Sequence, residues 1–458
     1  MAASGPAVGK RVMSRVPRIF ALALALLAAP ATVHADDTSS PKRKVPDYDG
    51  RGRKPTNASD VLLWIPRVLF SPVYFTTEYL IRRPLGGLLT WAERVNAFQS
   101  FYDFFVFGPD HRAGFAPIGF FDFGFNPSVG VYVFWDDALK RGNDLAFHGT
   151  TWGTDWLAGV WTDRVHFGKR GNTFTFNAVA IKRPDHAFFG VGPDALESDL
   201  GRYGEEMVDV SGAFDLKPAR PLEVRATGGI RDANFYAGHY GTDPSIEAES
   251  QTGAYPLPDG FAKGYTSVYE HLSFAVDSRK ARPVSGSGVR LELDGENAGD
   301  VRSGSGWVRY GGTFGGFWDI TGTGRILSLS FATAFADPLG KNPVPFTELV
   351  ALGGDGPMRG YIPGRLLGRS YAALTVRYRW PIWMWLDGSL QAAVGNVFDE
   401  HLEGFKPSLL RLSGALGIES TFSLDTSIEL LVGFGTETFD HGATVNSVRF
   451  LVGSNRGF

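Results

Sequence analysis

The chain has 458 residues, no cysteine and a formal net charge of −3 at pH 7. The lack of cysteine excludes a disulfide framework and a cysteine metal site, and the small net charge indicates no general attraction to nucleic acid. A mean hydropathy of −0.07 argues against a helical membrane protein, but it is compatible with a membrane barrel, because only alternate residues of a barrel strand face lipid.

The first segment, residues 1–35, has the features of a secretory signal peptide. A positively charged start precedes an apolar core at 19–29 that is too short to span a bilayer, and small residues at 33–35 precede Asp36. An uncleaved anchor is the alternative. Residues 36–59 are polar and rich in glycine and proline, which predicts a flexible leader.

Residues 60–110 are predicted to form an amphipathic helical segment. Arginines punctuate the apolar stretches of its first part, 60–95, and Pro66, Pro72 and Pro84 divide that part into short pieces. We expect one to three short helices at a membrane surface or against the mouth of a barrel. An ordinary packed helix pair is the alternative reading. The segment is too short to hold a chain of periplasmic β-α-α-β-β receptor modules.

Further along, the hydrophobic pattern changes to period two, and residues 111–458 are predicted to form a β-barrel. Leu329 and Phe331, for example, alternate with Ser328 and Ser330. Antiparallel closure is expected, because an open edge in lipid would leave backbone groups unpaired. The expected strands are 115–125, 127–136, 144–152, 155–166, 172–182, 204–216, 221–233, 265–276, 286–297, 303–318, 323–336, 371–382, 386–398, 409–420, 425–436 and 445–453.

A soluble β-sandwich shows the same local alternation, and three features favour the membrane barrel over it. Many expected strands are longer than the usual globular strand, their polar faces mix small residues with charges, and Trp380, Trp383 and Trp385 cluster at one turn as an interfacial girdle does. The predicted fold class is therefore all-β transmembrane: a 16-stranded antiparallel outer-membrane β-barrel with a short N-terminal helical segment. We expect the chain to be exported to the bacterial outer membrane.

The connection between the expected strands ending at 336 and starting at 371 is unusually long, and loops of such length usually have a function. It contains Leu352-Gly353-Gly354 and, four residues later, Met358-Arg359-Gly360-Tyr361. In both features the sequence resembles the bacterial surface antigen barrels, the BamA/TamA-like superfamily of outer-membrane assembly and translocation proteins. The resemblance covers roughly 110–458 and is strongest over 348–398.

The resemblance implies that this connection folds back into the lumen and that Arg359 meets acidic groups on the inner wall. A buried guanidinium needs such partners, because an unpaired buried charge is costly. Gly360 would permit a tight turn, and Tyr361 would pack on the wall with its hydroxyl satisfied. A solvated turn around Arg359 is the alternative.

Two features depart from or complete the family pattern. The family usually carries Phe-x-Asp-x-Gly on its thirteenth strand, whereas this chain keeps only the glycine, Gly395. Asp387 or Glu419, both inward by alternation, would then replace the missing acid as partner of Arg359. At the C-terminus, Gly453 and Phe458 fit the signal by which such barrels are recognised for assembly.

Three classes of function remain open on this sequence. The first is an aid to protein or lipid insertion or translocation at the outer membrane, and the second is a diffusion pore or a structural barrel. The third is a barrel enzyme, which we do not expect; the one inward histidine of interest, His271, is more readily a hydrogen-bonding residue of the lumen. No cofactor or metal motif is found. The expected partners are outer-membrane lipid, the barrel assembly machinery and a polypeptide or lipid client, with no nucleic acid.

Overall fold

The computed structural model describes residues 104–455 apart from 109, 169, 280–285, 384–385 and 421–426, together with Tyr79 and Gly87. The predicted signal peptide (1–35), the leader (36–59), most of the helical segment (60–110) and Phe458 lie outside the described residues. The end of the predicted helical segment differs from expectation, because Val106–Phe107 forms the short strand β1. Among the described residues, no helix combines the length and apolar character needed to cross a membrane.

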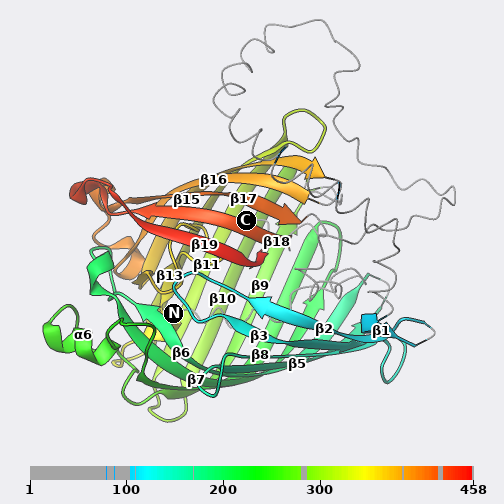
Figure 1. The fold of residues 1–458 in the computed structure, drawn as a ribbon, viewed down its shortest axis with the longest axis horizontal. Coiled ribbons are helices and arrows are strands. Elements are labelled where there is room, and N and C mark those ends of the chain that lie inside the picture. Colours follow the sequence, from blue (N-terminus) through cyan, green and yellow to red (C-terminus); the bar gives the residue numbers. More distant parts are fainter. Residues whose placement is uncertain are drawn as a thin grey trace, which may run out of the picture.

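The described chain is dominated by one antiparallel sheet, as predicted, in which each long strand pairs with the next along the chain. Figure 1 shows the strands tilted and the sheet curved around an interior. The long strands are β2 Ala113–Phe120, β3 Ser128–Trp135, β4 Asn143–Thr151, β5 Leu157–Phe167, β6 Asn172–Phe188, β7 Gly201–Leu216, β8 Leu222–Ala237, β9 Tyr265–Asp277, β10 Gly288–Asp300, β11 Gly306–Asp319, β12 Ile326–Pro338, β15 Ser370–Trp383, β16 Leu386–Phe398, β17 Arg411–Ser420, β18 Ser427–Thr436 and β19 Val445–Asn455.

The remaining elements are short. β1 pairs with β2, and a separate two-stranded sheet joins β13 to β14 within the connection from β12 to β15. These elements are β13 Val350–Leu352, β14 Leu366–Gly368, the helix α6 Ile246–Thr252 and the 3-10 turns η4 Glu197–Asp199, η5 Phe346–Glu348, η6 Glu400–Leu402, η7 Pro407–Leu409 and η8 Phe439–His441.

The two faces of the sheet differ as the alternation predicts. On β12, Leu329 and Phe331 are 42% and 46% exposed on the outer face, whereas Ser328 is buried on the inner face. On β15, Arg377 and Arg379 are buried inward while Leu374 is exposed outward. Large apolar side chains thus cover the outside and polar side chains line the interior, as in barrels that stand in lipid.

Strand β6 is longer than predicted, because it continues past 182 to Phe188. Its charged end broke the hydrophobic alternation, but the charges are compensated within the fold. The register with β7 shifts between Arg183 and His186, and Arg183 forms an ion pair with the buried Asp185 at 2.6 Å. The register shift changes the direction in which these side chains point, and the periodicity of the sequence does not reveal such a shift.

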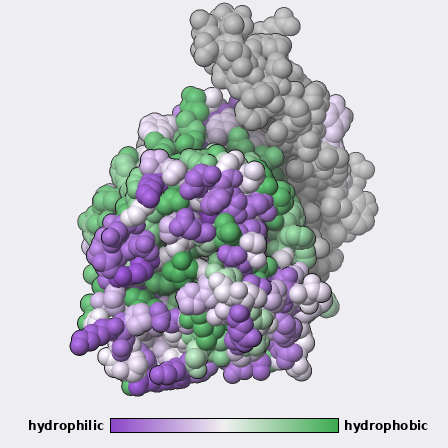
Figure 2. All heavy atoms as spheres, turned by 90° about the vertical axis from the view of Figure 1, so that its left-hand side faces the viewer, coloured by the Kyte–Doolittle hydropathy of each residue, from purple (hydrophilic) through white to green (hydrophobic). Residues whose placement is uncertain are grey.

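One end of the sheet carries the long connections and α6, and we call it the loop end; the opposite end is the turn end. Figure 2 looks onto the loop end, where hydrophilic side chains cover much of the face. Beneath them a cluster of buried aromatic rings fills the interior, with Phe346 of the connection between β12 and β15 packed against Phe188, Tyr203 and Phe235. This cluster packs the connection against β6, β7 and β8 inside the sheet at the loop end.

Candidate functional site: the connection inside the sheet

The connection from β12 to β15 is held at its first end by the buried carboxylate of Glu348, in η5. Tyr265 of β9 donates a hydrogen bond to it at 2.5 Å, Arg231 of β8 lies 2.9 Å from one oxygen and Arg309 of β11 lies 3.3 Å from the other. Two guanidinium groups and a hydroxyl compensate the cost of burying this charge. Glu348 therefore attaches the connection to the inner wall formed by β8, β9 and β11.

A second attachment of the connection is the segment 358–361, in which Met358, Arg359 and Tyr361 are fully buried. The Tyr361 hydroxyl donates to the carbonyl oxygen of Thr436 at 2.6 Å and accepts from the Thr436 amide at 2.9 Å. The Gly360 amide donates to Ser413 Oγ at 2.8 Å, and Ser447 Oγ donates to the Gly360 carbonyl at 3.0 Å. These bonds attach the segment to β17, β18 and β19, across the interior from Glu348.

Glycines on both sides allow this close approach. A Cβ at Gly360 would lie 1.9 Å from the carbonyl oxygen of Phe434, and a Cβ at Gly433 would lie 2.7 Å from the carbonyl oxygen of Arg359. A Cβ at Gly435 would meet the ring of Tyr361 at 2.5 Å. The backbone of the connection therefore packs directly against the backbone of β18. This close packing is a second reason, besides a tight turn, for glycine at position 360.

Arg359 lies in the connection, buried among charges of both signs. Burial lowers the pKa of its guanidinium and the neighbouring Arg377 lowers that pKa further, whereas Asp355 and Glu419 raise it. Nearby arginines thus disfavour the positive charge of Arg359, and nearby carboxylates favour it.

Both predicted partners of Arg359 lie on the inner wall. Asp387 and Glu419 are buried and stand opposite each other in the register of β16 and β17. Glu419 forms an ion pair with Arg377 and another with Arg379, 3.3 Å away. The pairing of Arg359 with Asp387 or Glu419 stays a prediction.

The connection also reaches the place where the first and last long strands meet. Arg449 of β19 forms an ion pair with Asp122, just after β2, at 2.9 Å, and donates to the carbonyl oxygen of Gly354 in the connection at 2.5 Å. Beside them the amide of Phe123 donates to the carbonyl oxygen of Phe450 at 3.4 Å. We call this contact of Asp122, Phe123, Arg449 and Phe450 the seam contact.

A second ion-pair cluster holds the connection at the loop end. Arg365 contacts Glu197 at 2.7 Å and Glu437 at 3.3 Å, and Arg411 pairs with Glu437 and donates to the carbonyl oxygen of Ala195 at 2.7 Å. Burial alone would raise the pKa of the Glu437 carboxyl, but Arg411 and Arg365 outweigh burial and hold that pKa below its usual range.

Sequence reasoning missed Glu348, Arg365 and Arg449, which fix the connection to three separate places. One of these attachments had a signal in the sequence, because Glu348 is the single charge within the mostly apolar segment 346–352. A charge in such a run is expected to be paired when buried. The partners come from distant strands, so their identity depends on strand register.

The other predicted residues lie apart from the connection. His271 lies on β9 opposite Glu296 of β10, and Gly453 pairs with Glu429 in the register of β18 and β19. Within the described part of the chain, no group of three or more histidine and acidic side chains is placed to hold a metal ion.

Comparisons with known proteins give a family model that matches part of the chain and solved structures of similar fold. Residues 266–447 match the Omp85 superfamily domain. The fold is similar to the crystal structure of BamA from Haemophilus ducreyi lacking POTRA domains 1–3, with a TM-score of 0.54, 13% identity, and coverage of 75% of this chain and 70% of that one. CdiB from Acinetobacter baumannii gives a TM-score of 0.46 at 10% identity, covering 74% of this chain and 59% of that one. No curated protein sequence matches the chain.

Proposed function

We infer that this chain, a BamA/TamA-like barrel of the Omp85 superfamily, assists the insertion or translocation of a polypeptide or lipid client at the outer membrane. The observation that carries the proposal is the connection from β12 to β15. It contacts the wall at Glu348, the opposite wall at Tyr361, and the seam contact through Gly354. A client that opened the seam would therefore disturb the connection, and the two events would be coupled.

The proposal includes a closed barrel of sixteen strands, in which β19 returns to β2. The ion pair between Asp122 and Arg449 and the backbone bond between Phe123 and Phe450 support closure at that place. Closure is also the physical requirement of a sheet in lipid, where an unpaired edge is costly. We propose the outer membrane as its location and lipid and the barrel assembly machinery as partners in its own insertion.

A diffusion pore is the competing function, and the filled interior disfavours it. The aromatic cluster around Phe346 and the buried connection occupy the loop end of the lumen. We also propose a non-enzymatic role, since the chemistry seen along the connection is that of ion pairs and hydrogen bonds that hold a segment in place.

Cross-linking of the seam tests the proposal. The native chain has no cysteine, so Phe123→Cys with Phe450→Cys would give one defined pair, and Ile230→Cys with Val268→Cys, facing residues of β8 and β9, is the matched control. Proteoliposomes would be assayed for insertion of a urea-unfolded eight-stranded barrel and for transfer of a fluorescent phospholipid.

Oxidation of the seam pair is expected to block at least one of these activities and reduction to restore it, with no effect in the control pair. Two results would overturn the proposal: activity that survives the seam cross-link, or a steady ion conductance in planar bilayers with neither transport activity, which would identify a pore.

A further inference from the structure

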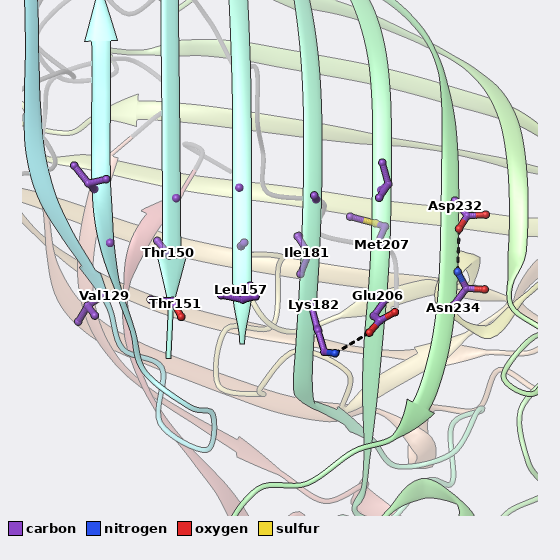
Figure 3. A pocket seen from close by; sticks show the side chains of 17 residues that line it. Val129, Thr150, Thr151, Leu157, Ile181, Lys182, Glu206, Met207, Asp232 and Asn234 are labelled. Carbon is purple, nitrogen blue, oxygen red and sulfur yellow. Dashed lines mark hydrogen bonds and ion pairs between the residues drawn. The ribbon is translucent and has the colours of Figure 1, made fainter. Parts of the chain in front are cut away.

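The outer face of the sheet is hollowed across β3 to β8, near the loop end. The hollow has a volume of about 820 Å³. Its floor is formed by small outward-facing residues on three neighbouring strands, Gly149 of β4, Gly159 of β5 and Ala180 of β6. Figure 3 shows these strands side by side with the lining side chains above them. Small residues in successive strands leave a depression where the neighbouring wall carries full side chains.

The hollow opens away from the lumen. Val129, Leu157 and Val208 border it and are about half exposed, as outward residues of this sheet are. Ile181 and Met207, which reach it from below, belong to the packed cluster on the inner face. The depression therefore offers an apolar surface to whatever surrounds the barrel.

Polar residues edge the hollow on its loop-end side. Lys182 and Glu206 form an exposed ion pair at 2.9 Å, and Asp232 accepts a hydrogen bond from Asn234 at 2.9 Å (Figure 3). Asp155 lies close enough to act electrostatically on Lys182. The margin thus presents the Lys182 ammonium group beside the carboxylates of Glu206 and Asp155. The third acid, Asp232, is engaged by Arg302 and Thr266.

We propose that this hollow binds one phospholipid whose headgroup carries both a phosphate and an ammonium group. The acyl chains would lie on the floor of Gly149, Gly159 and Ala180, the phosphate would meet Lys182, and the ammonium group would meet Glu206. Exposed ion pairs are weak and exchange partners readily, so a zwitterionic headgroup can replace the contact between Lys182 and Glu206 with two contacts of its own. An anionic headgroup would satisfy Lys182 but face an excess of carboxylates.

The inference rests on one part of the proposed function, namely that the outer face of the barrel lies in lipid. It does not depend on the seam or on transport. Recovery of the folded chain from membranes as a heat-modifiable band tests the lipid setting separately, so that failure there and failure of lipid selectivity are distinguishable.

Native mass spectrometry of the full chain in detergent tests the site, with phosphatidylethanolamine and phosphatidylglycerol added in equal amounts. The native chain is expected to retain one phosphatidylethanolamine several-fold more often than one phosphatidylglycerol. Gly159→Leu fills the floor, where the added Cβ has space beside Phe147 at 3.8 Å, and is expected to lose most of the bound lipid. The control is Gly228→Leu, an exposed glycine of β8 outside the hollow.

The charge arm compares Glu206→Gln with Glu270→Gln, an exposed glutamate of β9 outside the hollow. Glu206→Gln is expected to remove the preference between the two lipids while lipid remains bound, and Glu270→Gln is expected to keep the preference. Equal lipid retention by Gly159→Leu and Gly228→Leu would overturn the site. Preferential retention of phosphatidylglycerol, or of a phosphorylated glycolipid added in its place, would overturn the zwitterionic assignment.

Discussion

Replacing Gly360 with alanine is the most direct perturbation of the connection. The added Cβ would lie 1.9 Å from the Phe434 carbonyl oxygen and 2.9 Å from the Gly435 amide nitrogen, and backbone atoms cannot rotate away as a side chain can. The segment must therefore leave the wall. Four hydrogen bonds that hold it, made by Gly360 and Tyr361, each contribute about 1 kcal/mol.

Their loss amounts to about 4 kcal/mol, which corresponds to roughly a thousandfold rise in the undocked fraction. We expect faster proteolysis within the connection and a higher conductance in planar bilayers, while the strands remain folded. Gly340→Ala is the matched control, because a Cβ there meets no atom within 4 Å in the same connection. Proteolysis and conductance of Gly360→Ala equal to those of Gly340→Ala would refute the reasoning.

Four further predictions follow from the charges and faces of the sheet. Leu329→Arg should impair assembly far more than Ser330→Arg, by about 2–4 kcal/mol, because a basic residue on the lipid face of a barrel is costly; equal yields of heat-modifiable barrel would contradict the assignment of faces. Glu348→Ala removes the carboxylate shared by Arg231 and Arg309, which keep Asp209 and Glu296 as partners, and should destabilise docking of the connection by about 1.5–3 kcal/mol, measured by limited proteolysis. Arg359→Ala should raise the conductance above that of the native chain. Arg359→Lys should lower it only part of the way back, because an ammonium group lacks the planar fork of a guanidinium. A native conductance in both variants would refute the idea that Arg359 holds the connection in the lumen. The pKa of Glu437 is lowered in the folded chain, so its stabilisation is complete above the ordinary glutamate pKa of about 4.3 and is lost as the pH falls through the lowered value; Glu437→Gln should therefore be less stable than the native chain at neutral pH, with the difference vanishing in acid.

The sequence predicted the sheet well because an apolar outer face imposes a simple rule on its strands. The expected ranges 323–336 and 371–382 coincide closely with β12 and β15, since leucine and phenylalanine must alternate with small or polar residues when one face meets apolar surroundings. Strand β6 shows where the rule ends. Beyond residue 182 the hydrophobic alternation stops, and Arg183 forms an ion pair with Asp185.

The contacts of the connection were not predictable to the same degree. The motif indicated that Arg359 and Tyr361 turn inward, but the partner of a buried charge depends on register across several strands. Arg377 and Arg379, on β15, occupy Glu419, a pairing that alternation allows without selecting it. The Glu348 contacts join a connection to three separate strands, and no local pattern encodes such a meeting.

Two of the attachments of the connection, at Glu348 and at residues 360–361, have different requirements along the chain. The partners of Glu348 lie on β8, β9 and β11, all of which precede it in sequence. The hydrogen-bonding partners of Gly360 and Tyr361 lie on β17, β18 and β19, all of which follow. In a barrel that forms from its N-terminal strands onward, the first attachment can be made early, while the second waits for the last strands. Gly360 and Tyr361 can therefore form their hydrogen bonds only after β17 to β19 have joined the sheet. In an intermediate that lacks these strands, this part of the connection stays undocked.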